Sequence, residues 1–386
     1  MDAHSVPTPA NYRPRTLEGV LGRCLRQFPA VVLTGPRQSG KTTLVRRLLA
    51  DSHRYCSLDD PEIRGLARED PRLLLSRFPA PVILDEIQQA PEVLHAVKVD
   101  IDAHRDRRGR YVLTGSQVFP LMQGVTESLS GRAAILELHS LSIREIGGLA
   151  EGEADPLQVL ERGSSELLQQ GNRLEQSARW IRVGGFPEPA LDPSMEPALW
   201  QSSYVQTYLE RDVRNLRDIG SLADFQRFLF ALAARSGSLV NFADLSRDLG
   251  ISAKTVKAWV TVLEASGQAK VVKPFHSNLS KRLVKRPKVY FLDTGVLAYL
   301  LGVESDEQVH RGIAAGPLFE TAVFNQLVKL LAHRGSVPRI FFWRTAAGHE
   351  VDFLLDFGTR LVPVEAKLTA SPASRDATPI VELQRI

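Results

Sequence analysis

One stretch, residues 31–43 (VVLTGPRQSGKTT), constrains the fold of this chain more than any other. An apolar run leads into a Gly-x4-Gly-Lys-Thr loop, and residues 44–49 then show the pattern of an amphipathic helix. This order of strand, loop and helix is the setting that a phosphate-binding P-loop requires. The loop N–H groups and the helix N-terminus would offer positive partial charge to a phosphate. We expect the loop to contact nucleotide phosphates through Gly35, Pro36, Arg37, Gln38, Ser39, Gly40, Lys41, Thr42 and Thr43.

A pair of acids ends the apolar run in residues 81–87 (PVILDEI). The carboxyl ends of parallel strands meet at one edge of a sheet, where ligands bind, so we expect Asp85 and Glu86 beside the P-loop. Asp85 would hold Mg²⁺ together with the Thr42 hydroxyl, and Lys41 would reach the β- and γ-phosphates. Glu86 would polarise the attacking water. The alternative is a buried strand that ends in a solvated acidic turn. The favoured interpretation predicts ATP and Mg²⁺ as cofactors.

Two later positions could complete a hydrolytic site. Residues 111–117 (YVLTGSQ) form another apolar run, and its last residues, Ser116 and Gln117, could sense the γ-phosphate or orient the water. An ordinary strand-to-loop turn is the alternative for them. Arg132 precedes a further strand at 133–138 and could contact a γ-phosphate in its own subunit or in a neighbouring one. A surface salt bridge is an equally good interpretation of Arg132. A role across a subunit boundary would make the active protein a homo-oligomer.

Length and cysteine content narrow the class of protein. The chain has 386 residues, which is enough for two or three domains. It contains no run of about eighteen apolar residues, so we expect no membrane-spanning segment. Cys24 and Cys56 are too few for a disulfide framework or a zinc module. These features favour a cytoplasmic location.

Positive charge is concentrated in residues 254–288. The whole chain carries a formal charge of +4, whereas this segment alone carries +8 from nine basic side chains and Glu264. A segment of this kind favours a surface that binds a polyanion. A solvated charged surface without a partner is the alternative.

The same region has the pattern of a helix-turn-helix. In residues 244–260 (DLSRDLGISAKTVKAWV), Gly250 would end the first helix and Ser252 would cap the second. Strands at 270–273 and 288–292 would complete a winged helix. Such modules also serve as protein-packing units, so nucleic-acid contact is one of two interpretations. It would involve Lys254, Thr255, Lys257, Lys281, Arg282, Lys285 and Arg286, with DNA as the first candidate.

The last third of the chain holds a second set of acids. Residues 350–357 and 361–367 form a predicted hairpin, in which Asp352 and Glu365 can converge on one divalent metal. Lys367 shares a strand face with Glu365, and Glu320 on a helix upstream could add a third acid. Two acids and a lysine are the minimum for Mg²⁺-assisted phosphodiester cleavage. The alternative is a solvated hairpin with incidental acids.

Taken together, the motifs over residues 15–370 resemble a prokaryotic family of AAA-type ATPases with a C-terminal domain called DUF4143. The resemblance implies an ATPase core, a winged helix and a domain similar to PD-(D/E)xK nucleases. One departure is that only 19 residues follow Lys367, where such a nuclease fold normally adds a helix and a strand. This shortening favours an inactive or merely binding domain. The resemblance rests on LTGPRQSGKTTL, PVILDEIQ, YVLTGSQ, ESLSGRAAILELHSLS, GGFPEP, YLERDVR, NLSKRLVKRPKVYFLDTGVLAYLLG, GPLFETAVFNQL, HEVDFLL and VPVEAK.

The expected fold class is therefore α/β. It begins with a parallel-sheet P-loop core, followed by a helical winged-helix domain and a small α/β domain similar to restriction nucleases. The expected parts are a poorly structured lead-in (1–20), the P-loop domain (21–150), a helical linker or lid (151–222) with a long helix at 197–216, the winged helix (223–300), the nuclease-like domain (301–370) and a disordered tail (371–386).

Three functions remain open on the sequence. The favoured one is a Mg²⁺-dependent ATPase that couples ATP binding and hydrolysis to nucleic-acid binding. The first alternative is an ATP-gated, metal-dependent nuclease. The second is a nucleotide-controlled regulator or toxin-like protein whose C-terminal domain binds a protein partner.

Overall fold

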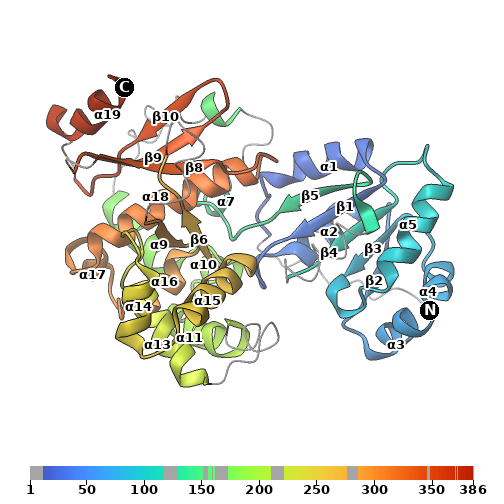
Figure 1. The fold of residues 1–386 in the computed structure, drawn as a ribbon. Helices are drawn as coiled ribbons and strands as arrows, with labels where there is room; N and C mark the ends of the chain where they lie inside the picture. The colour runs from blue at the N-terminus through green and yellow to red at the C-terminus, as the bar shows by residue number, and fades with distance from the viewer. Residues whose placement is uncertain are drawn as a thin grey trace. The chain divides into compact units, whose positions relative to one another are not determined.

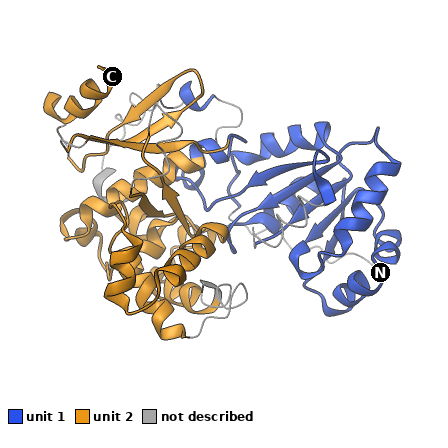
Figure 2. Cartoon of the chain, in the orientation of Figure 1, with its two compact units in different colours: residues 1–164, 330–336 blue, residues 165–329, 337–386 orange. Residues whose placement is uncertain are grey.

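The structure, a computed structural model, describes residues 12–116, 128–150, 155–158, 160, 173–209, 221–275, 286–345, 348–369, 371 and 373–385. The chain forms two compact units (Figure 2). Unit 1 comprises residues 1–164 and 330–336, and unit 2 comprises residues 165–329 and 337–386. Four residues with expected roles lie outside the described ranges: Gln117, Lys281, Arg282 and Lys285.

Unit 1 is built on a five-stranded parallel sheet with the strand order β2-β3-β4-β1-β5 (Figure 1). Its strands β1, β3 and β4 are buried throughout, as expected of parallel strands that are covered on both faces. The expected α/β core is confirmed. In chain order the elements are α1 (Leu17–Gln27), β1 (Ala30–Thr34), α2 (Lys41–Leu49), β2 (Arg54–Ser57), α3 (Pro61–Glu69), α4 (Pro71–Arg77), β3 (Val82–Asp85), the 3-10 turn η1 (Ile87–Gln89), α5 (Val93–Ala103), β4 (Tyr111–Thr114), β5 (Ala133–Glu137) and α7 (Ile143–Ile146).

Alternate residues of the strands enter two apolar cores, one on each face of this sheet. Val31 and Leu33 of β1 pack with α1 and α2, whereas Ala30 and Val32 pack with α3, α4 and α5 on the other face. The side-chain period of two along a strand produces this division. The carboxyl ends of β1, β3 and β4 consequently meet at one edge of the sheet, which leaves that edge for the residues that follow each strand.

The expectation of an unstructured lead-in over residues 1–20 is wrong for its second half. Arg15 and Thr16 are buried, and α1 begins at Leu17. The Arg15 guanidinium donates to the carbonyl oxygens of Ser39 (2.9 Å) and His139 (2.6 Å). This arginine therefore ties the start of the chain to the P-loop, a contact that local sequence pattern does not predict.

Unit 2 begins with a helical part. The expected long helix at 197–216 starts as α11 at Pro197 and passes into a π turn at Val205, and residues 210–220 lie outside the described ranges. Its aromatic residues Trp200 and Tyr204 are buried in the core, as expected. The helical elements are α9 (Arg173–Val183), α10 (Pro187–Leu191), α11 (Pro197–Tyr204), η3 (Val205–Leu209), α13 (Leu222–Ala233), α14 (Phe242–Leu249), α15 (Ala253–Ala265), α16 (Thr294–Leu300), α17 (Asp306–Arg311) and α18 (Ala315–Ala332), the end of which belongs to unit 1.

Two small antiparallel sheets complete unit 2. One pairs β6 (Ala269–Val272) with β7 (Lys288–Phe291), and the other has the order β10-β9-β8. The expected C-terminal hairpin is confirmed as β9 and β10 (Figure 1). The elements of the second sheet and of the tail are β8 (Ile340–Arg344), β9 (Glu350–Asp356), β10 (Leu361–Val364), η5 (Ser374–Ala377) and α19 (Thr378–Gln384).

Two expectations about the second half of the chain differ from the structure: the domain boundary near residue 300 and the disordered tail. One apolar core runs from Ala178 to Ala322, so the helical part and the start of the C-terminal part form a single unit without a division near residue 300. The tail expected to be disordered contains η5 and α19. Within the described part of the chain, no helix is both long and apolar enough to cross a membrane.

Candidate functional sites

The loop after β1 has the backbone geometry of a phosphate cradle. Gly35 has a φ of 141°, and a Cβ at this position would lie 2.2 Å from the carbonyl oxygen of Leu138. Only glycine fits such a close approach. Gly40 is left-handed, with a φ of 93°, and α2 begins at the next residue. The unpaired N–H groups of the first helical turn therefore stand at the end of the loop.

Lys41 folds back over this loop. Its side chain is nearly buried, and its Nζ donates to the carbonyl oxygens of Gly35 (2.9 Å) and Pro36 (2.8 Å). The Ser39 hydroxyl is fully buried and has no hydrogen-bond partner among the described residues. A buried hydroxyl without a partner costs free energy unless a ligand satisfies it. The loop thus has the donors that a bound phosphate would need.

Asp85 is the centre of a polar network at the carboxyl edge of the sheet. The Thr42 hydroxyl donates to both of its carboxylate oxygens, at 3.1 and 3.0 Å. The Tyr55 hydroxyl donates to Oδ2 at 2.6 Å, and the Thr114 hydroxyl donates to Oδ1. Burial and the neighbouring carboxylate raise the pKa of Tyr55, so the phenol stays protonated and remains a donor. The structure brings Thr42 and Asp85 together as expected and adds Tyr55 and Thr114, which sequence reasoning missed.

Glu86 is held in place by the residues that follow β4 and β3. Its backbone is left-handed, with a φ of 57°, and its N–H donates to the Thr114 hydroxyl at 3.2 Å. The carboxylate oxygen Oε2 accepts from Ser116 Oγ at 3.2 Å and from the Gln88 amide. Burial raises the pKa of Glu86, and the nearby Lys41 charge opposes the rise. Ser116 therefore lies next to Glu86 as expected, whereas Gln88 was not predicted.

The base of the P-loop is supported by a buried ionic cluster within unit 1. Glu145 is fully buried; its Oε1 lies 3.4 Å from Arg15 Nε and 3.2 Å from His333 Nδ1. Burial alone would raise the pKa of Glu145, but Arg15 and His333 hold it well below the usual range. Glu145 holds Arg15, and Arg15 in turn donates to the carbonyl oxygen of Ser39 in the P-loop. Glu145 thus positions the loop without contacting a bound phosphate itself.

Arg132 lies at the amino end of β5, whereas the P-loop follows the carboxyl end of β1. It precedes β5, which runs parallel to β1 with Ala133 beside Ala30 and Glu137 beside Thr34. The length of the strand, roughly 13 Å at about 3.3 Å per residue, separates Arg132 from the P-loop. The guanidinium makes two hydrogen bonds to Asp102, at 2.8 and 3.0 Å. Contact with a nucleotide in the same subunit, one of the two expected roles, is incompatible with this placement.

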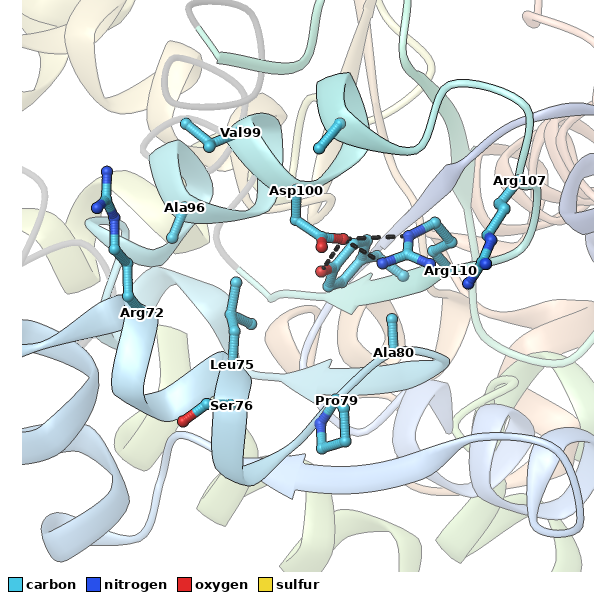
Figure 3. A pocket seen from close by; sticks show the side chains of 12 residues that line it. Arg72, Leu75, Ser76, Pro79, Ala80, Ala96, Val99, Asp100, Arg107 and Arg110 are labelled. Atoms are coloured by element: carbon cyan, nitrogen blue, oxygen red, sulfur yellow. Dashed lines mark hydrogen bonds and ion pairs between the residues drawn. The ribbon is translucent and has the colours of Figure 1, made fainter.

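A cavity of about 460 Å³ between α4 and α5 is separate from the P-loop (Figure 3). Asp100 is the acid in its wall, and its Oδ2 accepts from Arg110 Nη2 (2.5 Å) and from the Tyr111 hydroxyl (2.6 Å). The remaining wall is formed mainly by small and apolar side chains such as Ala96 and Val99. Two further arginines, Arg72 and Arg107, also line the cavity, whereas Asp100 is already paired within the protein.

The expected acids of unit 2 do come together. Ala366 N donates to Asp352 Oδ2 at 2.9 Å, and Asp352 N donates to Glu365 Oε2 at 3.4 Å. Lys367 Nζ lies 2.5 Å from Glu365 Oε1. The strand β10 ends at Val364, so Glu365 and Lys367 follow the strand rather than share its face as expected. Their contact is an ion pair, which leaves less positive charge for a substrate than predicted.

A second lysine, which the sequence analysis counted in the basic segment, is also part of this site. Lys288 is buried, and its Nζ lies 2.9 Å from Glu320 Oε1, 2.5 Å from Glu350 Oε1 and 4.0 Å from Asp352 Oδ1. The Tyr290 hydroxyl donates to Glu320 Oε1 at 2.6 Å. We define the acid cluster as Glu320, Glu350, Asp352 and Glu365. Sequence reasoning missed Glu350, Lys288 and Tyr290, although the two-residue spacing of Lys288 and Tyr290 on one strand was a usable signal.

The acid cluster does not form a metal centre in the structure. Within the described ranges, no group of three or more His, Cys, Asp or Glu side chains is arranged to hold a metal ion. The tail lies beside Glu365, at one side of the cluster. A cavity of about 370 Å³ is lined by Glu365 and Lys367 on one side and by Asp376 and Ile380 of the tail on the other.

The expected helix-turn-helix is confirmed in α14 and α15. Gly250 is left-handed, with a φ of 68°, and ends α14. The Ser252 hydroxyl accepts from Thr255 N at 3.0 Å and caps α15. Lys254 and Lys257 are exposed, whereas Thr255 is half-buried beside Ser252. Arg286 is described and exposed, but the other basic residues expected in the wing fall outside the described ranges.

Three family models match successive parts of the chain. Residues 27–147 match the family described as an AAA domain, residues 174–307 match the domain of unknown function DUF8612, and residues 315–386 match the domain of unknown function DUF4143. The chain thus contains an AAA-type ATPase domain. A single family spans 174–307, where the sequence predicted a lid and a winged helix with a boundary near residue 222.

Two relatives are similar over almost the whole chain. Uncharacterized proteins of Mycobacterium bovis and Mycobacterium tuberculosis are each 31% identical to it over 354 residues, which is 92% of this chain and 73% of theirs. Among solved structures, a Walker-type ATPase of Pyrococcus abyssi is similar over 78% of this chain and 99% of that chain. Its TM-score of 0.44 and identity of 16% are too low to support a conclusion about this chain.

Proposed function

Because this chain belongs to the family of proteins that join an AAA domain to a C-terminal DUF4143 domain, we propose that it is a Mg²⁺-dependent ATPase that couples ATP binding and hydrolysis to nucleic-acid binding. The observation that carries the ATPase part is the meeting of Thr42, Asp85 and Glu86 beside the P-loop. These residues come from α2 and from the end of β3, and they converge only because the strands are parallel.

The donors around Asp85 fit a magnesium ion. Mg²⁺ prefers oxygen ligands and usually keeps several waters, with one or two protein groups and phosphate oxygens completing the shell. The Thr42 hydroxyl and the Asp85 carboxylate, within 3.1 Å of each other, are oxygen ligands of this kind. When bound, the ion would neutralise charge on the β- and γ-phosphates. Tyr55 and Thr114 hold the Asp85 carboxylate in orientation through their hydroxyls.

Glu86 is the residue that we assign to the attacking water. A general base must lie within hydrogen-bond reach of the proton that it takes. Ser116 and Gln88 both donate to Glu86 Oε2, which fixes the carboxylate at the carboxyl edge of the sheet. Lys41 would exchange its two carbonyl acceptors for phosphate oxygens, and the loop N–H groups would bind the same phosphates.

Nucleic-acid contact is the less direct part of the proposal. It is supported by the cap and turn of α14 and α15 and by the exposure of Lys254 and Lys257 on the second helix. The two lysines would contact phosphates and hold the helix against the polyanion. Lys288, which also contributed to the charge of +8, does not serve this purpose because its ammonium group is buried among carboxylates.

We also propose that the active ATPase is a homo-oligomer in which Arg132 serves the nucleotide of a neighbouring subunit. Arg132 is on the amino edge of the sheet and the P-loop is on the carboxyl edge, so only a head-to-tail contact can bring the two together. A cavity of about 340 Å³ around Arg132 is also lined by Arg105 and Arg108. Asp102 also lines this cavity and pairs with Arg132 and Arg105, so a phosphate-bearing ligand would have to take the place of this acid on Arg132.

The decisive experiment compares ATP turnover with and without DNA or RNA. Purified full-length chain should hydrolyse ATP in the presence of Mg²⁺, and nucleic acid should change the rate. Turnover that is insensitive to both nucleic acids, together with copurification of a protein, would favour the nucleotide-controlled regulator instead. The nuclease alternative stays a prediction: Asp352 and Glu365 lie together and Lys367 pairs with Glu365, and cleavage of labelled DNA with Mn²⁺ would test it.

A further inference from the structure

The last third of the chain contributes one buried histidine to unit 1. His333 directly follows α18, and residues 330–336 belong to unit 1, whereas the rest of α18 belongs to unit 2. Gly335 is left-handed, with a φ of 78°, and a Cβ at this position would lie 2.8 Å from Cγ1 of Val20 in α1. Only glycine fits such a close approach. This turn brings His333 into unit 1, where 1% of its side chain is exposed.

His333 closes a buried ring of hydrogen bonds and ion pairs around Arg15. Its Nδ1 lies 3.2 Å from Glu145 Oε1, and the same oxygen lies 3.4 Å from Arg15 Nε. Arg15 Nη2 donates to the carbonyl oxygen of His139 at 2.6 Å, and His139 N donates to His333 Nε2 at 3.2 Å. Because Nε2 accepts, the ring proton of His333 is on Nδ1, which faces the carboxylate. Each buried partner that lost its contact would be left unsatisfied, so the ring resists displacement.

The ring touches the P-loop near both of its ends. Arg15 Nη1 donates to the carbonyl oxygen of Ser39 at 2.9 Å. The residue before His139 is Leu138, whose carbonyl oxygen would lie 2.2 Å from a Cβ at Gly35. A shift of the ring would therefore move the backbone around the space that a phosphate occupies.

We propose that His333 is a positioning residue for the P-loop, which it holds in place through Glu145 and Arg15. The part of the chain that matches the AAA family, residues 27–147, contains neither His333 nor Arg15. The phosphate loop of this domain thus depends on a side chain from beyond α18. The effect on catalysis rests on the proposed ATPase function, whereas the effect on the loop itself does not.

Two substitutions in the full-length chain separate the two ring contacts of His333. The amide nitrogen of His333→Asn can donate near the place of Nδ1 and keep the contact with Glu145. The amide oxygen of His333→Gln can accept near the place of Nε2 and keeps only the bond from His139. Glu145 still accepts from the N–H groups of Thr16 (2.8 Å) and Ser142 (2.9 Å) in both variants, so we expect both to fold.

The first measurement is backbone hydrogen exchange without nucleotide. We expect the peptide that covers residues 36–44 to exchange at least ~10-fold faster in His333→Gln than in wild type, because one hydrogen bond to a charged group is lost. His333→Asn should exchange like wild type over the same peptide. Wild-type exchange in His333→Gln, or equal acceleration in both variants, would overturn the proposal, since the contact with Glu145 would then not hold the loop.

The second measurement is ATP turnover at a temperature at which all variants are folded. The loop binds the phosphates both before and during the reaction, so we expect His333→Gln to raise KM for ATP about 10-fold and to change kcat by less than about twofold. His333→Asn should restore the wild-type KM. A purely structural role would lower the melting temperature of His333→Gln and leave KM unchanged, which would contradict the proposal.

His53→Gln is the matched control, because His53 is a half-buried histidine of unit 1 that contacts the Gly109 carbonyl oxygen (2.9 Å) and not the P-loop. It should change neither loop exchange nor KM. If His333→Gln does not fold, Glu145→Gln takes its place, and wild-type loop exchange in that variant would overturn the proposal. Wild-type protein without turnover, together with the expected exchange, would refute the ATPase proposal and support the positioning role.

Discussion

Lys41 in unit 1 and Lys288 in unit 2 are both nearly buried, yet their acceptors differ. Lys41 donates to two backbone carbonyl oxygens of the P-loop, whereas Lys288 lies against the carboxylates of Glu320 and Glu350. A carbonyl is a neutral acceptor that a phosphate oxygen can replace with a gain in electrostatic energy. A buried carboxylate that loses its ammonium is left as an unpaired charge.

The difference shows that the residue type does not decide what a buried lysine does. The acceptors around it decide whether its charge is available to a ligand or is used to hold the fold. In unit 1 the lysine stands at a helix N-terminus that also favours an anion. In unit 2 the lysine stands among acids that favour a cation.

The largest effect should come from Lys41→Ala. We expect no detectable ATP binding, since the loop would lose the charge that reaches the β- and γ-phosphates. Titration with a fluorescent ATP analogue measures the loss. Folded Lys288→Met should bind the analogue like wild type. If Lys288→Met lost nucleotide binding as completely as Lys41→Ala, the two lysines would not differ in the way proposed.

The second effect concerns the opposite edge of the unit 1 sheet. We expect Arg132→Ala to reduce ATP turnover roughly 10³-fold in the assembled protein, the size typical of an arginine supplied across a subunit boundary. Mixing it with Lys41→Ala should restore part of the activity, because each variant contributes the residue that the other lacks. Normal turnover of Arg132→Ala, or of a strictly monomeric protein, would leave this arginine as the partner of Asp102 alone.

Glu86→Gln should have the next largest effect. We expect ATP binding to be kept and turnover to fall at least ~100-fold, since the amide cannot accept a proton from water. Because burial raises the pKa of Glu86, wild-type turnover should fall as the pH drops through that raised pKa, where the carboxylate becomes protonated. The pH profile of Glu86→Gln should lack this acidic limb. A wild-type profile whose acidic limb reflects an unshifted glutamate, or unchanged turnover in the variant, would remove Glu86 from the water-activating role.

The smallest effect is expected for the two exposed lysines of α15, which would contact nucleic-acid phosphates. Lys254→Ala/Lys257→Ala should weaken DNA binding for all sequences and reduce the slope of log affinity against log salt by about two, roughly one for each phosphate contact. Arg77→Ala/Lys98→Ala removes the same charge from unit 1 and should leave the slope unchanged. Affinity of the wild type that does not depend on salt would exclude phosphate contacts by this helix.

Local pattern was sufficient where function depends on residues that are adjacent in the chain. The P-loop, the acids after β3, the cap and turn of α14 and α15, and the hairpin of β9 and β10 were all predicted from spacing. Each of these features is formed by hydrogen bonding or periodicity within about twenty residues. The prediction failed for Arg15 and for the tail, because the order of both comes from packing against distant residues.

The sequence by itself determined that unit 1 has an α/β core with a P-loop, and it predicted that Thr42 and Asp85 meet beside Lys41, because the strand–loop–helix order permits few arrangements. Only the tertiary structure decided that Arg132 lies at the far edge of the sheet and that Lys288 faces the acids of β9. Both results depend on which elements pack side by side. Lys288 and Glu350 are 62 residues apart, and a pattern of charges along a chain does not tell which of them will share a buried space.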